Sequence, residues 1–428
     1  MPGNPGNPAR HANRPTGAKK RPPKLAVPNF VVTKCERLVM SKKRKVHSLT
    51  GRITPDLMRR AFRSVKRNRG AAGIDKVSIQ MFEANLEENL AALMRDLKTG
   101  KLRARPLRRT WIPKGPGSDK FRPLGIPVVR DRVAQEVMRS LLAPVFEPLF
   151  HDASFGFIKG RNCHQAIERV LELHRQGHKV VLDADIKGFF DNIPHSVIMD
   201  AVAAEVADGN ILRLVEQFLT AGVMEDGVFK PTTIGTPQGG VISPLLANIV
   251  LNHLDWQLHE AGYHFVRYAD DFVVVCRAKR QAQEALALVE RVLEGELGLS
   301  LSAEKTTIAT FGKGFDFLGF TLSSRSRRMR SKSVEKFKAK IRELSIRKRN
   351  LDAEAVEKLN RVIRGTANYF GTEFSTNRWL FGRLDKWIRM RLRCMKLKRK
   401  SFKDNSKLRL TYFRHKLGLL SMRDLCRS

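Results

Sequence analysis

Two adjacent carboxylates interrupt an otherwise apolar stretch of the chain. Asp270 and Asp271 lie between residues 265–267 and 272–275, whose Phe and Val content indicates two short buried strands. Charge at the junction of buried strands is costly unless it is paired or bound to a metal. The pattern therefore predicts a tight hairpin with two carboxylates at its tip, as in Mg²⁺ sites for nucleotide chemistry. The alternative is a solvated turn, because Asp is a preferred turn residue.

A second acidic cluster lies in the strand-like run 180–186. Alternation of side chains along a strand places Asp183 and Asp185 on one face, with Asp185 near the strand's end. Phosphoryl transfer calls for two cations about 4 Å apart, held by carboxylates from different strands. Asp185, with Asp270 and Asp271 further along the chain, would supply such a set.

Composition limits the classes of partner. The chain has 428 residues and a formal net charge of +38, which indicates a polyanion such as nucleic acid. No apolar run reaches the roughly 18 to 20 residues that span a bilayer, so we expect no membrane partner. The five cysteines are widely spaced and form no C-x-x-C pair, which favours a reducing cytosol over a disulfide framework or a zinc ribbon.

The positive charge is concentrated in two flanks. Residues 1–60 hold 15 Lys and Arg against 2 Asp and Glu, and residues 321–428 hold 32 against 9. The middle, residues 61–320, holds 33 against 31 and is almost neutral. A neutral catalytic body between basic appendages is typical of an enzyme that grips nucleic acid.

The pattern of apolar residues predicts an α+β protein. Helices are expected over 54–97, interrupted by a loop at 68–75, and a hairpin over 107–130. Strands are expected at 179–186 and 265–276, with an amphipathic helix at 283–297. Past Phe320 the chain is expected to be all helical.

One helix of this last region combines an apolar stripe with dense basic residues. The stripe recurs at helical spacing in residues 380–392. A solvated helix face is one interpretation of the basic residues, but their density favours contacts with RNA phosphates. The basic residues predicted to bind RNA are Arg383, Lys386, Arg389, Arg391 and Arg393.

Five motifs, in order along the chain, resemble the palm motifs of reverse transcriptases. They are Asp-Ile-Lys-Gly-Phe-Phe-Asp (185–191), Gly-Thr-Pro-Gln-Gly-Gly-Val-Ile-Ser-Pro-Leu-Leu-Ala-Asn (235–248), Tyr-Ala-Asp-Asp (268–271), Leu-Ser-Ala-Glu-Lys-Thr (301–306) and Phe-Leu-Gly-Phe (317–320). Three more narrow the resemblance to group II intron reverse transcriptase/maturases: Arg-Pro-Leu-Gly-Ile-Pro (122–127), Ser-Phe-Gly-Phe followed by Gly-Arg (154–161), and Arg-Gly-Thr-Ala-Asn-Tyr-Phe (364–370). Eight motifs in this order make coincidence negligible.

The resemblance implies an α+β right-hand polymerase fold of fingers and palm, followed by an all-helical thumb/maturase domain. The boundaries expected are a basic N-terminal extension without fixed structure at 1–48, a fingers extension at 49–110, fingers and palm at 111–320, and the thumb and maturase domain at 321–428.

The resemblance also assigns roles to the acidic clusters. Asp185, Asp270 and Asp271 would be the catalytic carboxylates that bind two Mg²⁺ ions, with the Ile186 carbonyl as a further ligand. Phe190 would lie under the incoming sugar, where an aromatic ring leaves no room for a 2′-hydroxyl and selects dNTP. Its alternative interpretation is an ordinary core phenylalanine.

Further residues are implied to bind the nucleotide and the primer. Arg122 and Lys114 would hold the triphosphate, with Lys120 as an alternative to Lys114. Gln238 would contact the nucleotide and template, and Lys305 would either protonate the pyrophosphate or steady the palm. The primer grip would be Phe317, Leu318, Gly319 and Phe320, for which core packing is the alternative.

Some positions depart from the family pattern. Ile158 stands where the family often has arginine, and Thr366 where the thumb motif often has tryptophan. About 108 residues follow Phe320, without a His/Cys/Asn cluster, so the chain resembles the shorter class that lacks an HNH endonuclease.

The function implied is RNA-directed DNA synthesis together with binding of a group II intron RNA to assist its splicing and mobility by target-primed reverse transcription. The expected partners are the intron RNA, an RNA template with a DNA primer, a DNA target and dNTPs, in the bacterial cytosol and at the nucleoid. Two alternatives remain: a free-standing reverse transcriptase in defence or repair, and a non-catalytic RNA-binding splicing factor.

Overall fold

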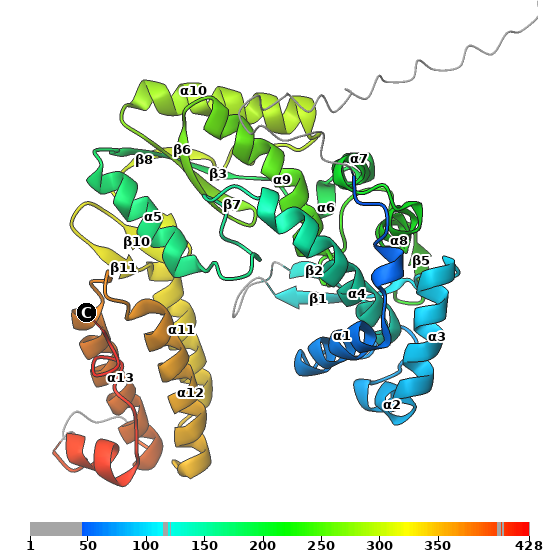
Figure 1. Ribbon diagram of the computed structural model, residues 1–428. Coiled ribbons are helices and arrows are strands. Elements are labelled where there is room, and N and C mark those ends of the chain that lie inside the picture. Colours follow the sequence, from blue (N-terminus) through cyan, green and yellow to red (C-terminus); the bar gives the residue numbers. More distant parts are fainter. Residues whose placement is uncertain (1–44, 114–118, 120, 400–403, 405, 428) are drawn as a thin grey trace, which may run out of the picture. The chain divides into compact units, whose positions relative to one another are not determined.

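The computed structural model of the chain describes residues 45–113, 119, 121–399, 404 and 406–427. Mixed helices and short sheets make up most of it, and long helices follow towards the C-terminus (Figure 1). Over the described residues, no helix combines the length and the apolar character needed to cross a bilayer.

The first folded segment is helical and matches the prediction for 54–97. It contains η1 (Thr50–Arg52), α1 (Pro55–Arg67), α2 (Ile79–Ala84) and α3 (Leu86–Thr99). Helix α1 begins where the Thr54 side chain accepts a hydrogen bond from the Leu57 amide, so Thr54 caps the helix. The loop predicted at 68–75 separates α1 from α2.

The predicted unstructured extension ends earlier than residue 48. Val46 pairs in parallel with Val206, with its amide donating to the Glu205 carbonyl at 2.9 Å, and Leu49 is fully buried. The prediction is therefore wrong for residues 45–48. Their partner lies about 160 residues away, beyond the reach of a local sequence pattern. Residues 1–44 lie outside the described part of the chain.

A four-stranded sheet follows, in the order β2-β1-β4-β5. Its strands are β1 (Leu107–Pro113), β2 (Phe121–Ile126), β4 (Val223–Glu225) and β5 (Val228–Lys230). Strands β1 and β2 form the hairpin predicted over 107–130, with Arg122 opposite Ile112. The helices that follow or precede these strands are α4 (Val129–Phe146), η2 (Glu147–Leu149), α7 (His195–Glu205) and α8 (Gly209–Thr220).

A second four-stranded antiparallel sheet carries the acidic clusters. Its order is β6-β7-β3-β8, and its strands are β3 (Val180–Asp185), β6 (His264–Tyr268), β7 (Asp271–Cys276) and β8 (Thr307–Thr310). The strand predicted at 179–186 and the hairpin predicted at 265–276 are both confirmed. Val181, Val266 and Val273 share one face and pack with α5 (Cys163–Arg175). The opposite face meets α9 (Ser243–Glu260) and α10 (Lys279–Glu290), which continues as the π-helical turn η3 (Arg291–Glu296).

The region past Phe320 is not all helical, so that prediction is wrong for residues 321–329. A small sheet of order β11-β10-β9 consists of β9 (Phe315–Phe317), β10 (Phe320–Leu322) and β11 (Arg327–Met329). Strands of three residues are too short to display an alternating pattern in the sequence. The helices then begin: α11 (Ser331–Leu344), α12 (Ala353–Phe370), α13 (Arg378–Lys396) and the π-helical turn η5 (Tyr412–Lys416).

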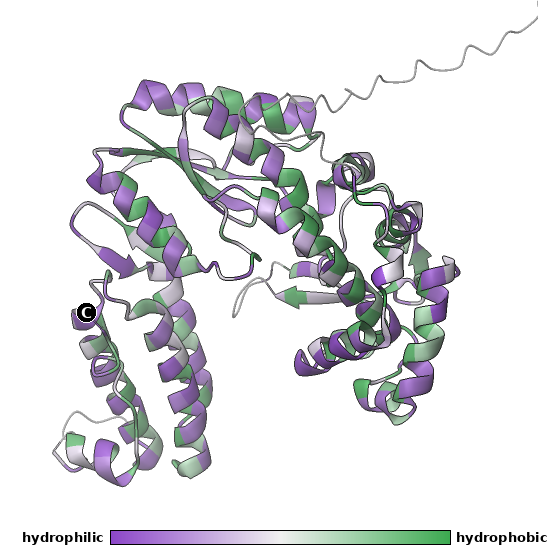
Figure 2. Cartoon of the chain, in the orientation of Figure 1, coloured by the Kyte–Doolittle hydropathy of each residue, from purple (hydrophilic) through white to green (hydrophobic). Residues whose placement is uncertain are grey.

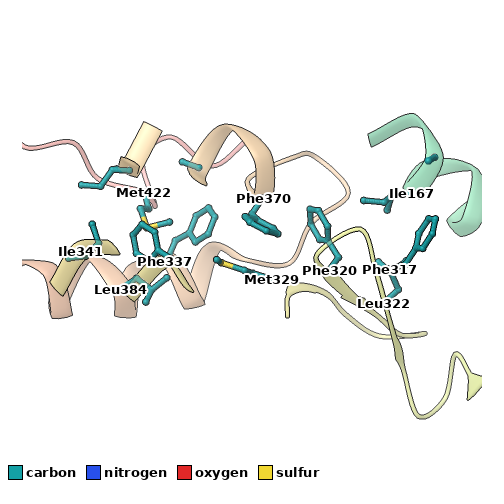
Figure 3. Packing of buried hydrophobic residues seen from close by; sticks show 14 of the residues in the cluster. Ile167, Phe317, Phe320, Leu322, Met329, Phe337, Ile341, Phe370, Leu384 and Met422 are labelled. Atoms are coloured by element: carbon teal, nitrogen blue, oxygen red, sulfur yellow. The ribbon is translucent and has the colours of Figure 1, made fainter. Parts of the chain in front are cut away.

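One hydrophobic cluster links the small sheet to its neighbours. It contains Ile167 of α5, Phe317 and Phe320 of the small sheet, and Phe337 and Leu384 of the following helices (Figure 3). Helices α11, α12 and α13 each present both hydrophobic and hydrophilic residues, as expected of helices that bury one side (Figure 2).

Candidate active site at the acidic end of the central sheet

The β6–β7 hairpin places the two adjacent carboxylates at its tip, as predicted. Tyr268 pairs with Asp271, so Ala269 and Asp270 form a two-residue turn. Ala269 adopts a positive φ of 58°, which is unfavourable for a residue with a Cβ. The turn is held from both sides. The Ala269 carbonyl accepts a hydrogen bond from the Arg267 guanidinium at 3.0 Å, and Gly156 packs so closely on the Ala269 amide that a Cβ there would clash.

The neighbouring strand brings a third carboxylate to the tip. Asp185 lies directly opposite Asp271 in the β3–β7 ladder, and Asp183 lies on the same face two residues earlier. Asp271 keeps an exposed surface, but loss of hydration at this crowded sheet end raises its pKa to about 6, and Asp270 and Asp185 add to the rise. Burial likewise raises the pKa of Asp183 to about 7, and Asp271 and Asp185 add to it. We call Asp183, Asp185, Asp270 and Asp271 the acidic end.

Asp270 belongs to the same electrostatic cluster. Burial raises its pKa, and the negative charge of Asp185 adds to this rise, while Lys305 and Arg267 oppose it. The predicted set of Asp185, Asp270 and Asp271 is thus brought together from two strands and a turn. Asp183 was predicted to share their face but was not assigned to the site.

Lys305 neutralises one of these carboxylates. Its ammonium donates to Asp185 Oδ2 at 2.7 Å. The loop that carries Lys305 is fastened to the end of β3, because the Ser302 amide donates to the Asp185 carbonyl at 2.8 Å and Leu301 forms a bridge with the buried Ile186. A role of the Ile186 carbonyl as a metal ligand stays a prediction.

The chemistry of the acidic end fits a divalent cation, although its side chains do not yet enclose one. Within the described ranges, no three His, Cys, Asp or Glu side chains form a cluster able to hold a metal ion as they stand. The donors are carboxylate oxygens, which hard divalent cations prefer, and desolvation followed by repulsion from Asp270 and Asp185 raises the pKa of Asp271. The Lys305 ammonium occupies one of the two carboxylate oxygens of Asp185, for which a bound cation would compete.

The loop 235–240 connects the residues predicted to contact the nucleotide. Its Thr236 amide donates to the Phe190 carbonyl at 2.7 Å, and Gln238 Nε2 donates to Asp191 Oδ2 at 3.0 Å. The Gln238 carbonyl in turn accepts from the Gly125 amide of β2 at 2.7 Å. Phe190 and Gln238 are therefore joined through this loop to the strand that carries Arg122.

Phe190 lies in the short helix α6 (Phe189–Asn192), after Gly188 in a left-handed conformation. Its ring meets the edge of the buried Phe189 ring at a centroid distance of 5.3 Å and is only partly buried. The position of Phe190 under the sugar and its alternative interpretation as a core phenylalanine both stay predictions. Arg122 is exposed on β2, whereas Lys114 and Lys120 lie outside the described residues.

The predicted primer grip is a tight hairpin whose phenylalanines point into the core. Phe317 and Phe320 are 1 % and 0 % exposed, so their rings pack within the hydrophobic cluster, as the alternative interpretation held. Leu318 and Gly319 form the turn between β9 and β10, both with positive φ. The Tyr369 hydroxyl donates to the Leu318 carbonyl at 2.9 Å and holds this turn. Contact of the two phenylalanine rings with a primer is therefore excluded in this conformation.

The side chains of the two residues that depart from the family pattern, Ile158 and Thr366, are both accommodated within the fold. Ile158 is buried, at 7 % exposure, so its side chain offers no surface for a phosphate. The Thr366 hydroxyl donates to the Val362 carbonyl at 2.8 Å within α12, which satisfies it inside its own helix.

The five basic residues predicted to bind RNA differ in their surroundings. Arg383 and Lys386 are exposed on α13. Arg391 donates to the Ser345 carbonyl at 2.9 Å, and Arg393 donates to the Leu408 carbonyl at 2.8 Å and lies over the Phe413 ring. Burial lowers the pKa of Arg389 and that of Arg393. The guanidinium groups of Arg391 and Arg393 therefore bond to carbonyls that join parts of the fold, and RNA binding by the five residues stays a prediction.

A buried ion pair behind the hairpin was not predicted. The Arg267 guanidinium is fully buried and donates to both carboxylate oxygens of Asp255 on α9, with Nε at 2.7 Å from Oδ1. It also donates to Asn248 Oδ1 at 2.8 Å, besides the Ala269 carbonyl. The signal in the sequence was an arginine within the apolar strand 264–268, since such a charge needs a buried partner.

Comparison with known proteins agrees with this arrangement. Residues 112–322 match the family model "Reverse transcriptase (RNA-dependent DNA polymerase)", and residues 334–413 match "Group II intron, maturase-specific domain". Protein YkfC of Escherichia coli (strain K12) is 35% identical over 308 residues, which are 63% of this chain and 80% of that protein. The chain belongs to the group II intron-encoded reverse transcriptase/maturases.

Another relative carries the family in its name. The group II intron-encoded protein LtrA of Lactococcus lactis subsp. cremoris is 28% identical over 425 residues, 76% of this chain and 70% of that protein. Among solved structures, the telomerase from Candida albicans matches with a TM-score of 0.41 and 15% identity over 75% of this chain and 64% of that one, a likeness too slight to support an inference. This reverse transcriptase/maturase is an RNA-directed DNA polymerase with a function in intron splicing and mobility.

Proposed function

We propose that the reverse transcriptase/maturase extends a DNA primer on an RNA template at the acidic end, with two Mg²⁺ ions held by Asp185, Asp270 and Asp271. The observation that carries this proposal is the direct opposition of Asp185 and Asp271 beside the Asp270 turn. When bound, the ions supply positive charge to the attacking and leaving oxygens. Like charges opposite one another are unfavourable in a sheet, so a cation at this position would relieve repulsion.

The surrounding side chains then act on the substrate. The Lys305 ammonium would pass from Asp185 to the triphosphate, where it neutralises charge and can donate a proton to the leaving pyrophosphate. Arg122 would hold phosphate oxygens as a two-pronged donor. Gln238, fixed by Asp191 and Gly125, would contact the base pair being formed.

The maturase-specific domain and the basic flanks would bind the intron RNA and present it for splicing. The same complex would meet a DNA target and copy the intron by target-primed reverse transcription, in the bacterial cytosol and at the nucleoid. The uneven charge supports this division, because 36 of the 38 net positive charges lie in residues 1–60 and 321–428.

Substitution of one carboxylate tests the metal assignment. Asp270→Asn removes one negative ligand, and we expect primer extension on an RNA template to fall at least about 100-fold, since several kcal/mol of transition-state stabilisation are lost. The matched control is Asp200→Asn, an exposed aspartate on α7. Single-turnover extension of a pre-annealed primer is the measurement. Extension by Asp270→Asn at the rate of the control would disprove the assignment.

A further inference from the structure

A groove in the C-terminal region contains exposed aromatic and basic side chains. It encloses about 570 Å³ between the β10–β11 hairpin, α11 and α13. None of the residues of the acidic end lines it. Among those that do are Arg328, Glu335, Lys338, Trp379, Arg383 and Trp387, and we call this the tryptophan groove.

An arginine guanidinium lies over the ring of each tryptophan that lines the groove. The Arg383 guanidinium lies 4.8 Å from the centre of the Trp379 ring, and that of Arg342 lies 5.7 Å from the centre of the Trp387 ring. Trp379 is nonetheless 69 % exposed, the largest exposure among the exposed large hydrophobic residues of the described chain. Most of its indole surface is therefore in water although one guanidinium is stacked on it.

The excess of basic over acidic side chains in the groove favours an anionic partner. Three of its lining side chains are basic (Arg328, Lys338 and Arg383) and one is acidic. The acidic one, Glu335, accepts from Lys338 at 2.9 Å and lies 3.8 Å from Arg342, so its charge is offset locally. An excess of positive charge beside an open indole disfavours a purely apolar protein partner.

We propose that the tryptophan groove binds an unpaired segment of RNA, with one base stacked on the Trp379 indole and adjacent phosphates on Arg328, Lys338 and Arg383. Aromatic side chains interleaved with basic ones are the features by which proteins hold single-stranded nucleic acid. Bases in a duplex already stack on each other, so the groove favours loops and bulges over paired RNA. This inference rests on the proposed function, because it names the form of RNA that the maturase region recognises.

Three variants separate stacking from charge. Trp379→Ala is expected to weaken binding of a labelled, unstructured RNA of about 12 nucleotides by about 5- to 100-fold, with an unchanged slope of log K against log salt. Trp379→Phe retains a ring and is expected to keep most of the affinity. Arg383→Gln is expected to make this slope less negative by about 0.7, the value for one phosphate that the protein no longer neutralises.

The matched control is Phe229→Ala, which removes an exposed aromatic ring on β5, outside the groove. Equal affinity of Trp379→Ala, Phe229→Ala and the unmodified protein for the unpaired RNA would overturn the proposal. So would an equal loss for Trp379→Ala on a fully paired RNA duplex. Thermal unfolding of each variant identifies a loss that comes from misfolding, in which case Trp379→Phe decides. Failure of the unmodified protein to bind intron RNA would instead contradict the proposed function.

Discussion

The backbone at Phe190 is held by contacts that do not involve its ring. Its carbonyl accepts from Thr236, and Gly235 packs so closely that a Cβ there would lie 2.6 Å from the Asp191 carbonyl oxygen. These contacts do not depend on the side chain at position 190. The ring can therefore be changed while α6 and the loop 235–240 keep their places, which makes the proposed selection of sugars testable.

Phe190→Val is expected to raise the use of rNTP relative to dNTP at least about tenfold, because a smaller side chain leaves room for a 2′-hydroxyl that the ring would exclude; this corresponds to about 1.4 kcal/mol. Single-nucleotide incorporation kinetics measure the ratio. Phe189→Val is the contrast, since Phe189 is 2 % exposed and its truncation is expected to lower stability without changing the choice of sugar. An unchanged ratio in Phe190→Val would leave dNTP selection without this mechanism.

The elements around the acidic end were predicted well where their patterns are local. Short apolar runs rich in Val and Phe indicated β3, β6 and β7, and period-two geometry placed Asp183 with Asp185. Other features depend on distant partners. The pairing of Val46 with Val206, the three-residue strands past Phe320 and the binding of Arg393 to the Leu408 carbonyl leave no periodic pattern in the sequence. The resemblance to a family supplied roles, but only the structure separated basic residues that face water from those that join the fold.

The Arg267–Asp255 pair links α9 to the hairpin turn. Arg267→Met is expected to cost about 3–5 kcal/mol of stability, because it leaves the Asp255 carboxylate buried without its partner. The double variant Arg267→Met/Asp255→Leu removes both charges and is expected to regain much of that stability. It does not restore the hydrogen bond to the Ala269 carbonyl, so primer extension is expected to stay reduced.

Urea unfolding and primer extension as a function of Mg²⁺ concentration measure the two effects separately. If the double variant regains both stability and extension at the same Mg²⁺ concentration as the unmodified protein, then Arg267 stabilises the fold without positioning the turn. A requirement for more Mg²⁺ in a variant of normal stability is the result expected of a positioning residue.

Across the whole molecule, charge and chemistry are separated along the sequence. The middle of the chain is nearly neutral and contains the acidic end, whereas residues 321–428 carry a large positive excess. Formal charge nevertheless overstates what is available to RNA. Arg391 and Arg393 each use the Nε and Nη2 donors of the guanidinium on oxygen atoms of the fold, which leaves fewer donors for phosphate. Lys386 and Lys396 are exposed on the same helix and present their ammonium groups to water.

Two double variants of α13 with the same change in net charge distinguish these classes. Lys386→Gln/Lys396→Gln is expected to weaken intron RNA binding with little change in stability. The slope of log K against log salt is expected to become less negative by about 0.7–0.9 for each phosphate that the protein no longer neutralises. Arg391→Gln/Arg393→Gln removes the same charge but breaks bonds from cations to backbone carbonyls, and is expected to cost about 1.5–3 kcal/mol of stability per residue. RNA binding titrated against salt, together with urea unfolding, provides both readings. Equal salt slopes and equal stabilities in the two variants would show that net charge alone governs this helix.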